Sequence, residues 1–163
     1  MNSDGDDPRD HPATMKGPGD PTRVEYRRRL IARARCWTDD ERRVIADVFY
    51  DELLAQHPSL RPKFESVDMA AQARKLSATL GLVASLDDDR QRLGSEALRL
   101  GAIAGHGALD ATDFQTFATT LAHVLALFQT EIPYQLARQL WQSDLDAIVE
   151  VMQAIQPDAE AAD

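Results

Sequence analysis

Apolar side chains recur every three or four residues along much of this chain, which is the spacing of one face of an α-helix. The pattern is clearest in two late stretches. The first holds Phe114, Phe117, Ala118, Leu121, Leu125 and Phe128, and the second holds Leu136, Leu140, Trp141, Leu145, Ile148, Met152 and Ile155. Pro133 fits the first turn of the last helix. Because no segment alternates like a strand, the sequence predicts an all-α domain.

A helix start signal also lies near the beginning of the chain, where Asp20 precedes Pro21. An acidic cap followed by a first-turn proline is typical of a helix N-terminus, and we expect this helix to run to about Trp37. Its predicted buried positions are Val24, Leu30, Ile31, Ala34 and Trp37. The other face carries Arg27, Arg28, Arg29, Arg33 and Arg35.

Two further helices are predicted in the first half of the chain. Thr38 or Asp39 caps the first of them, which ends before Pro58. Its apolar positions are Val44, Ile45, Val48, Phe49, Leu53 and Leu54. After a turn through residues 61–64, Asp68 is a plausible cap for a helix from Met69 to about Leu86.

The acidic run 87–89 favours the start of another helix, because acids are stabilised at a helix N-terminus. That helix is expected to end near His106. The whole pattern predicts six or seven main helices in a domain over residues 21–156. Residues 1–20 and 157–163 have little to bury, and we expect a disordered leader and a disordered tail there.

Charge and cysteine content exclude several classes of protein. The net charge is −9, but residues 21–156 hold 19 acidic and 16 basic side chains, so the domain has no basic footprint for nucleic acid. A single cysteine, Cys36, excludes an intrachain disulfide and fits a reducing compartment. With neither a secretory signal nor a long apolar run, the sequence predicts a cytoplasmic protein that does not enter a membrane.

His106 is the main candidate for metal chemistry. It lies between Gly105 and Gly107, which leave room beside its ring, and it follows a predicted helix whose end offers carbonyl acceptors for the second ring nitrogen. A lone imidazole on one face of haem leaves the other face open for a ligand. The alternative is a histidine on the surface or at a helix cap.

Tyr50, Gln72 and Lys75 are candidates for the opposite side of such a cofactor. Tyr50 lies on the buried side of an apolar helix, and a buried hydroxyl needs a partner. Gln72 lies on a stripe with Met69, Ala73, Leu76 and Leu80, and Lys75 beside it could reach a haem propionate. The alternatives are a core tyrosine with a backbone partner, a half-exposed glutamine and a solvated lysine.

Taken together, these residues make the chain resemble the globin family. Residues 22–156 are similar to bacterial single-domain haemoglobins and to the globin domain of flavohaemoglobins. The resemblance is closest over residues 48–64, which include Pro58 and Phe64, and over residues 68–76. The end of the last predicted helix, from Leu140-Trp141 to Val151-Met152, is also similar.

The resemblance implies a globin fold around haem b. His106 would be the proximal iron ligand and Phe64 would wedge against the haem. Tyr50 and Gln72 would form the distal pair, and Ala46 and Ala73 would allow two helices to cross closely. The remaining expected cofactor contacts are Lys75, Leu76, Phe114 and Leu145. Phe114 and Gln156 stand where flavohaemoglobin-type members carry a tyrosine and a glutamate, which hydrogen-bond the proximal histidine and push electron density towards the iron. Their replacement argues against a strongly activated, peroxidase-like proximal histidine here.

We expect such a protein to bind dioxygen, NO or CO at a five-coordinate iron. Oxidation of NO to nitrate at the same site would need an external reductase, because the chain has no room for a flavin domain. One alternative is a haem-based sensor that acts on a separate partner through the face formed by Arg27–Arg35. A second alternative is a globin-like scaffold that binds no haem.

Overall fold

The computed structural model describes residues 20–83 and 110–155 of the chain. All regular secondary structure in these residues is helical, which confirms the predicted all-α class. The elements are α1 (Pro21–Arg35), α2 (Asp39–Gln56), the 3₁₀ turn η1 (Pro58–Leu60), α3 (Arg61–Phe64), α4 (Met69–Val83), α6 (Ala111–Leu127) and α7 (Tyr134–Ile155).

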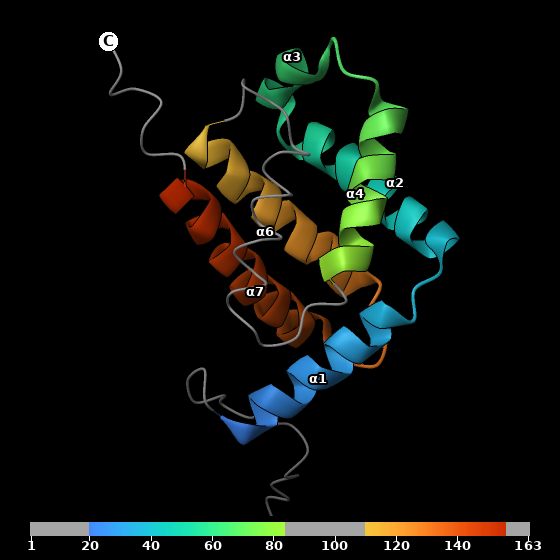
Figure 1. The fold of residues 1–163 in the computed structure, drawn as a ribbon, viewed down its shortest axis with the longest axis vertical. Coiled ribbons are helices and arrows are strands. Elements are labelled where there is room, and N and C mark those ends of the chain that lie inside the picture. Colours follow the sequence, from blue (N-terminus) through green and yellow to red (C-terminus); the bar gives the residue numbers. More distant parts are fainter. Residues whose placement is uncertain (1–19, 84–109, 156–163) are drawn as a thin grey trace, which may run out of the picture.

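The longer helices are packed in two groups that share one core. α6 and α7 form an antiparallel hairpin, while α2 packs on both α4 and α6 (Figure 1). α1 lies across the end of this assembly, where Arg27 reaches Asp144 of α7 at 3.0 Å. α2 is therefore the element that connects the α4 side of the molecule to the α6/α7 hairpin.

Capping side chains fix the start of the first helices, as the sequence predicts. Asp20 accepts a hydrogen bond from the Thr22 amide at 2.9 Å. Thr38, rather than Asp39, caps α2, and it forms a reciprocal capping box with Glu41. Asp68 accepts from the amide of residue 71 at 3.1 Å, so the expected cap of α4 is also present. Each of these bonds satisfies an amide that the helix itself leaves without a partner.

Two helix boundaries differ slightly from expectation. α1 ends at Arg35 rather than near Trp37, because the amides of Cys36 and Trp37 bond to carbonyls three residues back and tighten the last turn. α7 begins at Tyr134, one residue after Pro133. The carbonyl of Pro133 accepts the first helical bond of α7, so this proline caps the helix instead of lying in its first turn.

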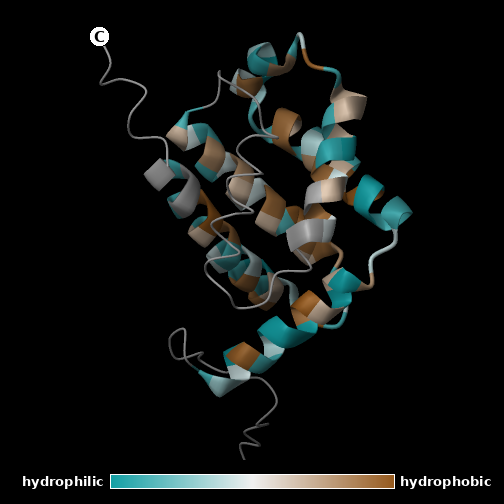
Figure 2. Cartoon of the chain, in the orientation of Figure 1, coloured by the Kyte–Doolittle hydropathy of each residue, from teal (hydrophilic) through white to brown (hydrophobic). Residues whose placement is uncertain are grey.

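The core takes its largest fully buried side chains from α1, α2, α6 and α7. They are Trp141, Phe49, Leu30, Ile45, Leu53, Leu125, Leu140 and Val124. Figure 2 shows more brown along α6 than along α1, which is mostly teal. This difference fits their places, since α1 covers the core from outside whereas α6 runs through it.

Two valines expected in the core are exposed instead. Val24 has 42% of its surface exposed and Val44 has 50%. Val24 lies six residues before Leu30, which turns it about 120° away from the buried face of α1. Val44 is about 100° around α2 from its buried neighbour Ile45. Single apolar residues on a surface are normal in soluble proteins.

Several predictions fall outside the described residues. They are the leader before residue 20, the helix over residues 87–106 with His106, and Gln156 with the tail. The predicted end of the third helix near Leu86 also lies outside, because α4 is described only to Val83. Among the helices that are described, none is both long and apolar enough to span a bilayer.

Candidate functional site

The structure brings Tyr50 and Gln72 together in the core between α2 and α4. Both side chains are buried, each with 6% of its surface exposed, and they are hydrogen-bonded to each other. The resemblance to the globin family implied that these two residues lie together, whereas the polar residues on apolar helix faces by themselves indicated only that each needs a hydrogen-bond partner. The bond satisfies polar groups that would otherwise be buried at a cost of about 1–3 kcal/mol.

Burial raises the pKa of Tyr50 to about 12, because the phenolate loses its hydration, while the bond to Gln72 opposes this shift. The Tyr50 hydroxyl can donate or accept a hydrogen bond, and the Gln72 amide offers both an N–H donor and a carbonyl acceptor.

Aromatic rings surround the Tyr50 side chain. Phe64 of α3 meets the Tyr50 ring edge-on, with centroids 6.1 Å apart, and Phe49 meets it at 4.9 Å. Phe117 of α6 completes the group, since it stacks with Phe64 at 6.0 Å and packs edge-on against Phe49 at 5.5 Å. The sequence predicted Phe64 as one wall here, but it placed Phe49 and Phe117 only on helix stripes.

The other predicted site residues lie at different depths. Leu76 is one turn after Gln72 on α4 and packs half-buried on the core, whereas Lys75 is exposed to solvent. Phe114 is half-buried at the start of α6, and Leu145 is 7% exposed on α7. Both belong to the α6/α7 part of the core.

His106, the predicted iron ligand, lies outside the described residues. The structure therefore describes the surroundings of Tyr50, Gln72 and Phe64 but not those of His106.

An ion pair that the sequence did not predict joins the Phe64 segment to α6. Lys63 of α3 contacts the carboxylate of Asp113, whose side chain is only 12% exposed. Burial alone would raise the pKa of Asp113, but the bonds from Lys63 and from the amide of Asp110 outweigh it, and the pKa of Asp113 is lowered. Lys63 is thereby held beside Phe64, at the edge of the aromatic group.

Asp113 also belongs to a capping box at the start of α6. It accepts from the amide of Asp110, and Asp110 accepts from the amide of Asp113, both at 2.9 Å. The signal was present in the sequence as two aspartates three residues apart before an apolar run.

Ala46 and Ala73 are both buried, at 0% and 5% exposure, on the two helices that pack together as α2 and α4. Small side chains on both helices allow the backbones to approach closely. This close packing brings Tyr50 of α2 within hydrogen-bonding reach of Gln72 of α4.

The two histidines in the described residues have other surroundings. His57 is the C-terminal cap of α2, and His123 of α6 pairs with the hydroxyl of Tyr134 at 2.5 Å. Within residues 20–83 and 110–155, no three histidine, cysteine or acidic side chains gather in a way that could hold a metal ion.

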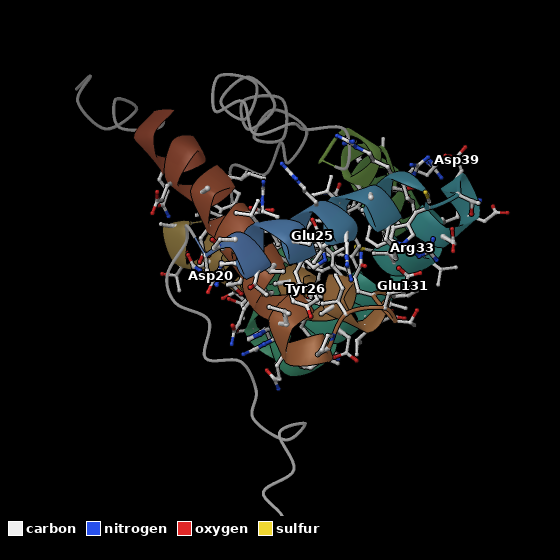
Figure 3. All side chains as sticks on the ribbon, turned by 90° about the horizontal axis from the view of Figure 1, so that it is seen from below. Asp20, Glu25, Tyr26, Arg33, Asp39 and Glu131 are labelled. Atoms are coloured by element: carbon white, nitrogen blue, oxygen red, sulfur yellow. The ribbon has the colours of Figure 1, made fainter. Side chains whose placement is uncertain are left out.

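The arginine face of α1 is largely engaged within the chain. Arg27 pairs with Asp144 of α7, Arg29 with Glu25, and Arg33 with Glu41 of α2. Figure 3 shows this side of the molecule, with Glu25 and Arg33 along α1. The pairs of Arg27 and Arg33 attach α1 to its neighbours, the pair of Arg29 lies within α1, and together they leave less of the face for the separate partner that a sensor would need.

Comparison of the chain with protein-family models, with curated proteins and with solved structures finds no match.

Proposed function

We propose that this protein is a haem-binding globin that binds dioxygen reversibly and also takes NO or CO. The proposal rests on the resemblance of residues 22–156 to bacterial single-domain haemoglobins, together with one structural observation. That observation is the buried hydrogen bond between Tyr50 and Gln72 inside an aromatic wall. The resemblance assigns these two residues to the distal side of the haem, where they would bond to a bound gas.

The described residues fit one side of a haem pocket. Phe64 offers a flat aromatic face and Leu76 an aliphatic one, and Tyr50 with Gln72 supplies hydrogen-bonding groups in a largely apolar space. On the other side, His106 would hold the iron. Lys75 is exposed on the same helix as Gln72, which leaves its ammonium in solvent where a propionate would also lie.

Haem would supply an iron centre that takes a diatomic gas reversibly. The protein residues would set how long the gas stays. The Tyr50 hydroxyl donates its hydrogen to the gas molecule, while the Gln72 amide holds the phenolic oxygen in place. The surrounding rings exclude water, which strengthens both hydrogen bonds. Oxidation of NO to nitrate in the same pocket would need electrons from an external reductase.

Dissociation kinetics test the role of Tyr50. In Tyr50→Phe the hydrogen-bond donor is gone, and we expect dioxygen to leave roughly 10–100-fold faster, because such a bond contributes ~1–3 kcal/mol. Gln72→Leu should also accelerate release. The double variant should fall short of the product of the two effects, since both act through one hydrogen bond.

Tyr26→Phe is the matched control, because it removes the same hydroxyl from a half-buried ring on α1. Its dioxygen dissociation rate should equal that of the unmodified protein. If the protein binds haem and Tyr50→Phe releases dioxygen at the unmodified rate, the role given to Tyr50 is wrong.

A further inference from the structure

A second feature of interest is a polar cleft between the first turn of α1 and the middle of α7. It has a volume of about 360 Å³, is open to solvent on one side, and is lined by Arg23, Arg138, Gln139, Gln142, Ser143 and Asp146. Figure 3 shows α1 lying across α7 on this side of the molecule. Every side chain that lines the cleft is polar, so it is not a gap left by imperfect core packing.

Two arginines line this cleft, Arg23 and Arg138, and neither has an ion-pair partner among the residues that the structure describes. Arg23 lies one turn before Arg27 on the same face of α1, and Arg27 pairs with Asp144 of α7. Arg23 also lies on the side of α1 that faces α7, where it lines the cleft together with Arg138. Two like charges that line one cleft repel each other, and a bound anion would remove this cost.

The one acidic residue in the cleft is already held in place. Oδ1 of Asp146 accepts hydrogen bonds from the side-chain amides of Gln115 at 2.9 Å and Gln142 at 2.8 Å. The cleft therefore keeps a net charge of about +1 in a chain whose formal net charge is −9. The second carboxylate oxygen of Asp146, with Ser143 and Gln139, can bond to hydroxyl groups.

We propose that this cleft binds a small phosphate ester that carries hydroxyl groups. Guanidinium forks match phosphate oxygens in charge and geometry, which places the phosphate between Arg23 and Arg138. The hydroxyl groups would then lie along Ser143 and Asp146. This site is separate from the Tyr50–Gln72 pair and does not depend on the proposed gas binding.

Calorimetric titration of the full chain with ribose 5-phosphate, in a buffer free of phosphate and sulfate, tests the proposal. We expect saturable binding at one site per chain. Arg23→Gln and Arg138→Gln should each weaken it at least about tenfold, since each removes a charge-assisted contact. Arg43→Gln is the matched control, because Arg43 is exposed on α2 away from the cleft, and it should bind as the unmodified protein does.

Three further titrations identify what is recognised. Ribose without phosphate should not bind, and inorganic phosphate and sulfate should bind more weakly than ribose 5-phosphate. Equal affinity for sulfate, inorganic phosphate and ribose 5-phosphate would mean an adventitious ion only and would overturn the proposal. Absence of saturable binding, or full affinity in both cleft variants, would also overturn it. None of these readouts depends on haem.

Discussion

Tyr50 and Gln72 place two polar groups in a part of the core that is otherwise aromatic and aliphatic. Helical periodicity indicated only that each residue lies on an apolar stripe and needs a hydrogen-bond partner, and the resemblance to the globin family implied that the two lie together. The contact between Lys63 and Asp113 was not predicted. These residues are fifty positions apart, and no local pattern shows that the α3 segment meets the start of α6.

The raised pKa of Tyr50 makes folding stability sensitive to alkaline pH. Its folded pKa is about 12, above the ordinary value of 10, so its contribution is complete below pH 10 and is lost as the pH rises towards 12. This difference in pKa between the folded and unfolded states corresponds to roughly 2–3 kcal/mol in the free energy of unfolding. Chemical denaturation of the apoprotein between pH 9 and pH 12 should show this loss.

In Tyr50→Phe, folding stability should fall less between pH 10 and pH 12 than in the unmodified protein, because phenylalanine does not titrate. Tyr26→Phe should show the same fall as the unmodified protein. Equal alkaline slopes for Tyr50→Phe and the unmodified protein would show that the Tyr50 hydroxyl is not shielded from water as described.

At the scale of helices, the sequence was a reliable guide where a side-chain cap marks a start, whereas Pro133 caps α7 instead of lying in its first turn. Asp20, Thr38 and Asp68 begin helices as expected, and α2 ends before Pro58. The ends without such a marker were less well predicted. The last turn of α1 tightens just before Trp37, whose ring stacks on that of Trp141 of α7 with 6.3 Å between the centroids.

The close packing of α2 on α4 should be sensitive to side-chain size. Ala46→Leu adds volume at a fully buried position, and we expect it to lower the free energy of unfolding by about 1–3 kcal/mol. Ala55→Leu makes the same change at an exposed position of α2 and should have little effect. Urea denaturation measures both. Equal stabilities for the two variants would show that α2 and α4 do not pack tightly at Ala46.

At the scale of the whole molecule, the apolar periodicity predicted the helical class and most of the core. It did not predict how the helices are arranged, because periodicity identifies a buried face without identifying what covers it. Val24 illustrates this: it lies two helical turns before Ile31 on the same side of α1, yet it is exposed to solvent. The globin arrangement and the haem site therefore remain proposals that depend on the resemblance and on the Tyr50–Gln72 pair.

The visible spectrum of the purified protein, recorded ferric, after reduction with dithionite and then under CO, tests the central claim most directly. Haem binding with one open coordination position predicts a Soret band, a five-coordinate spectrum after reduction and a clear shift on adding CO. A colourless protein that takes up no added haem would contradict the account and leave a helical domain whose Tyr50–Gln72 pair serves another purpose.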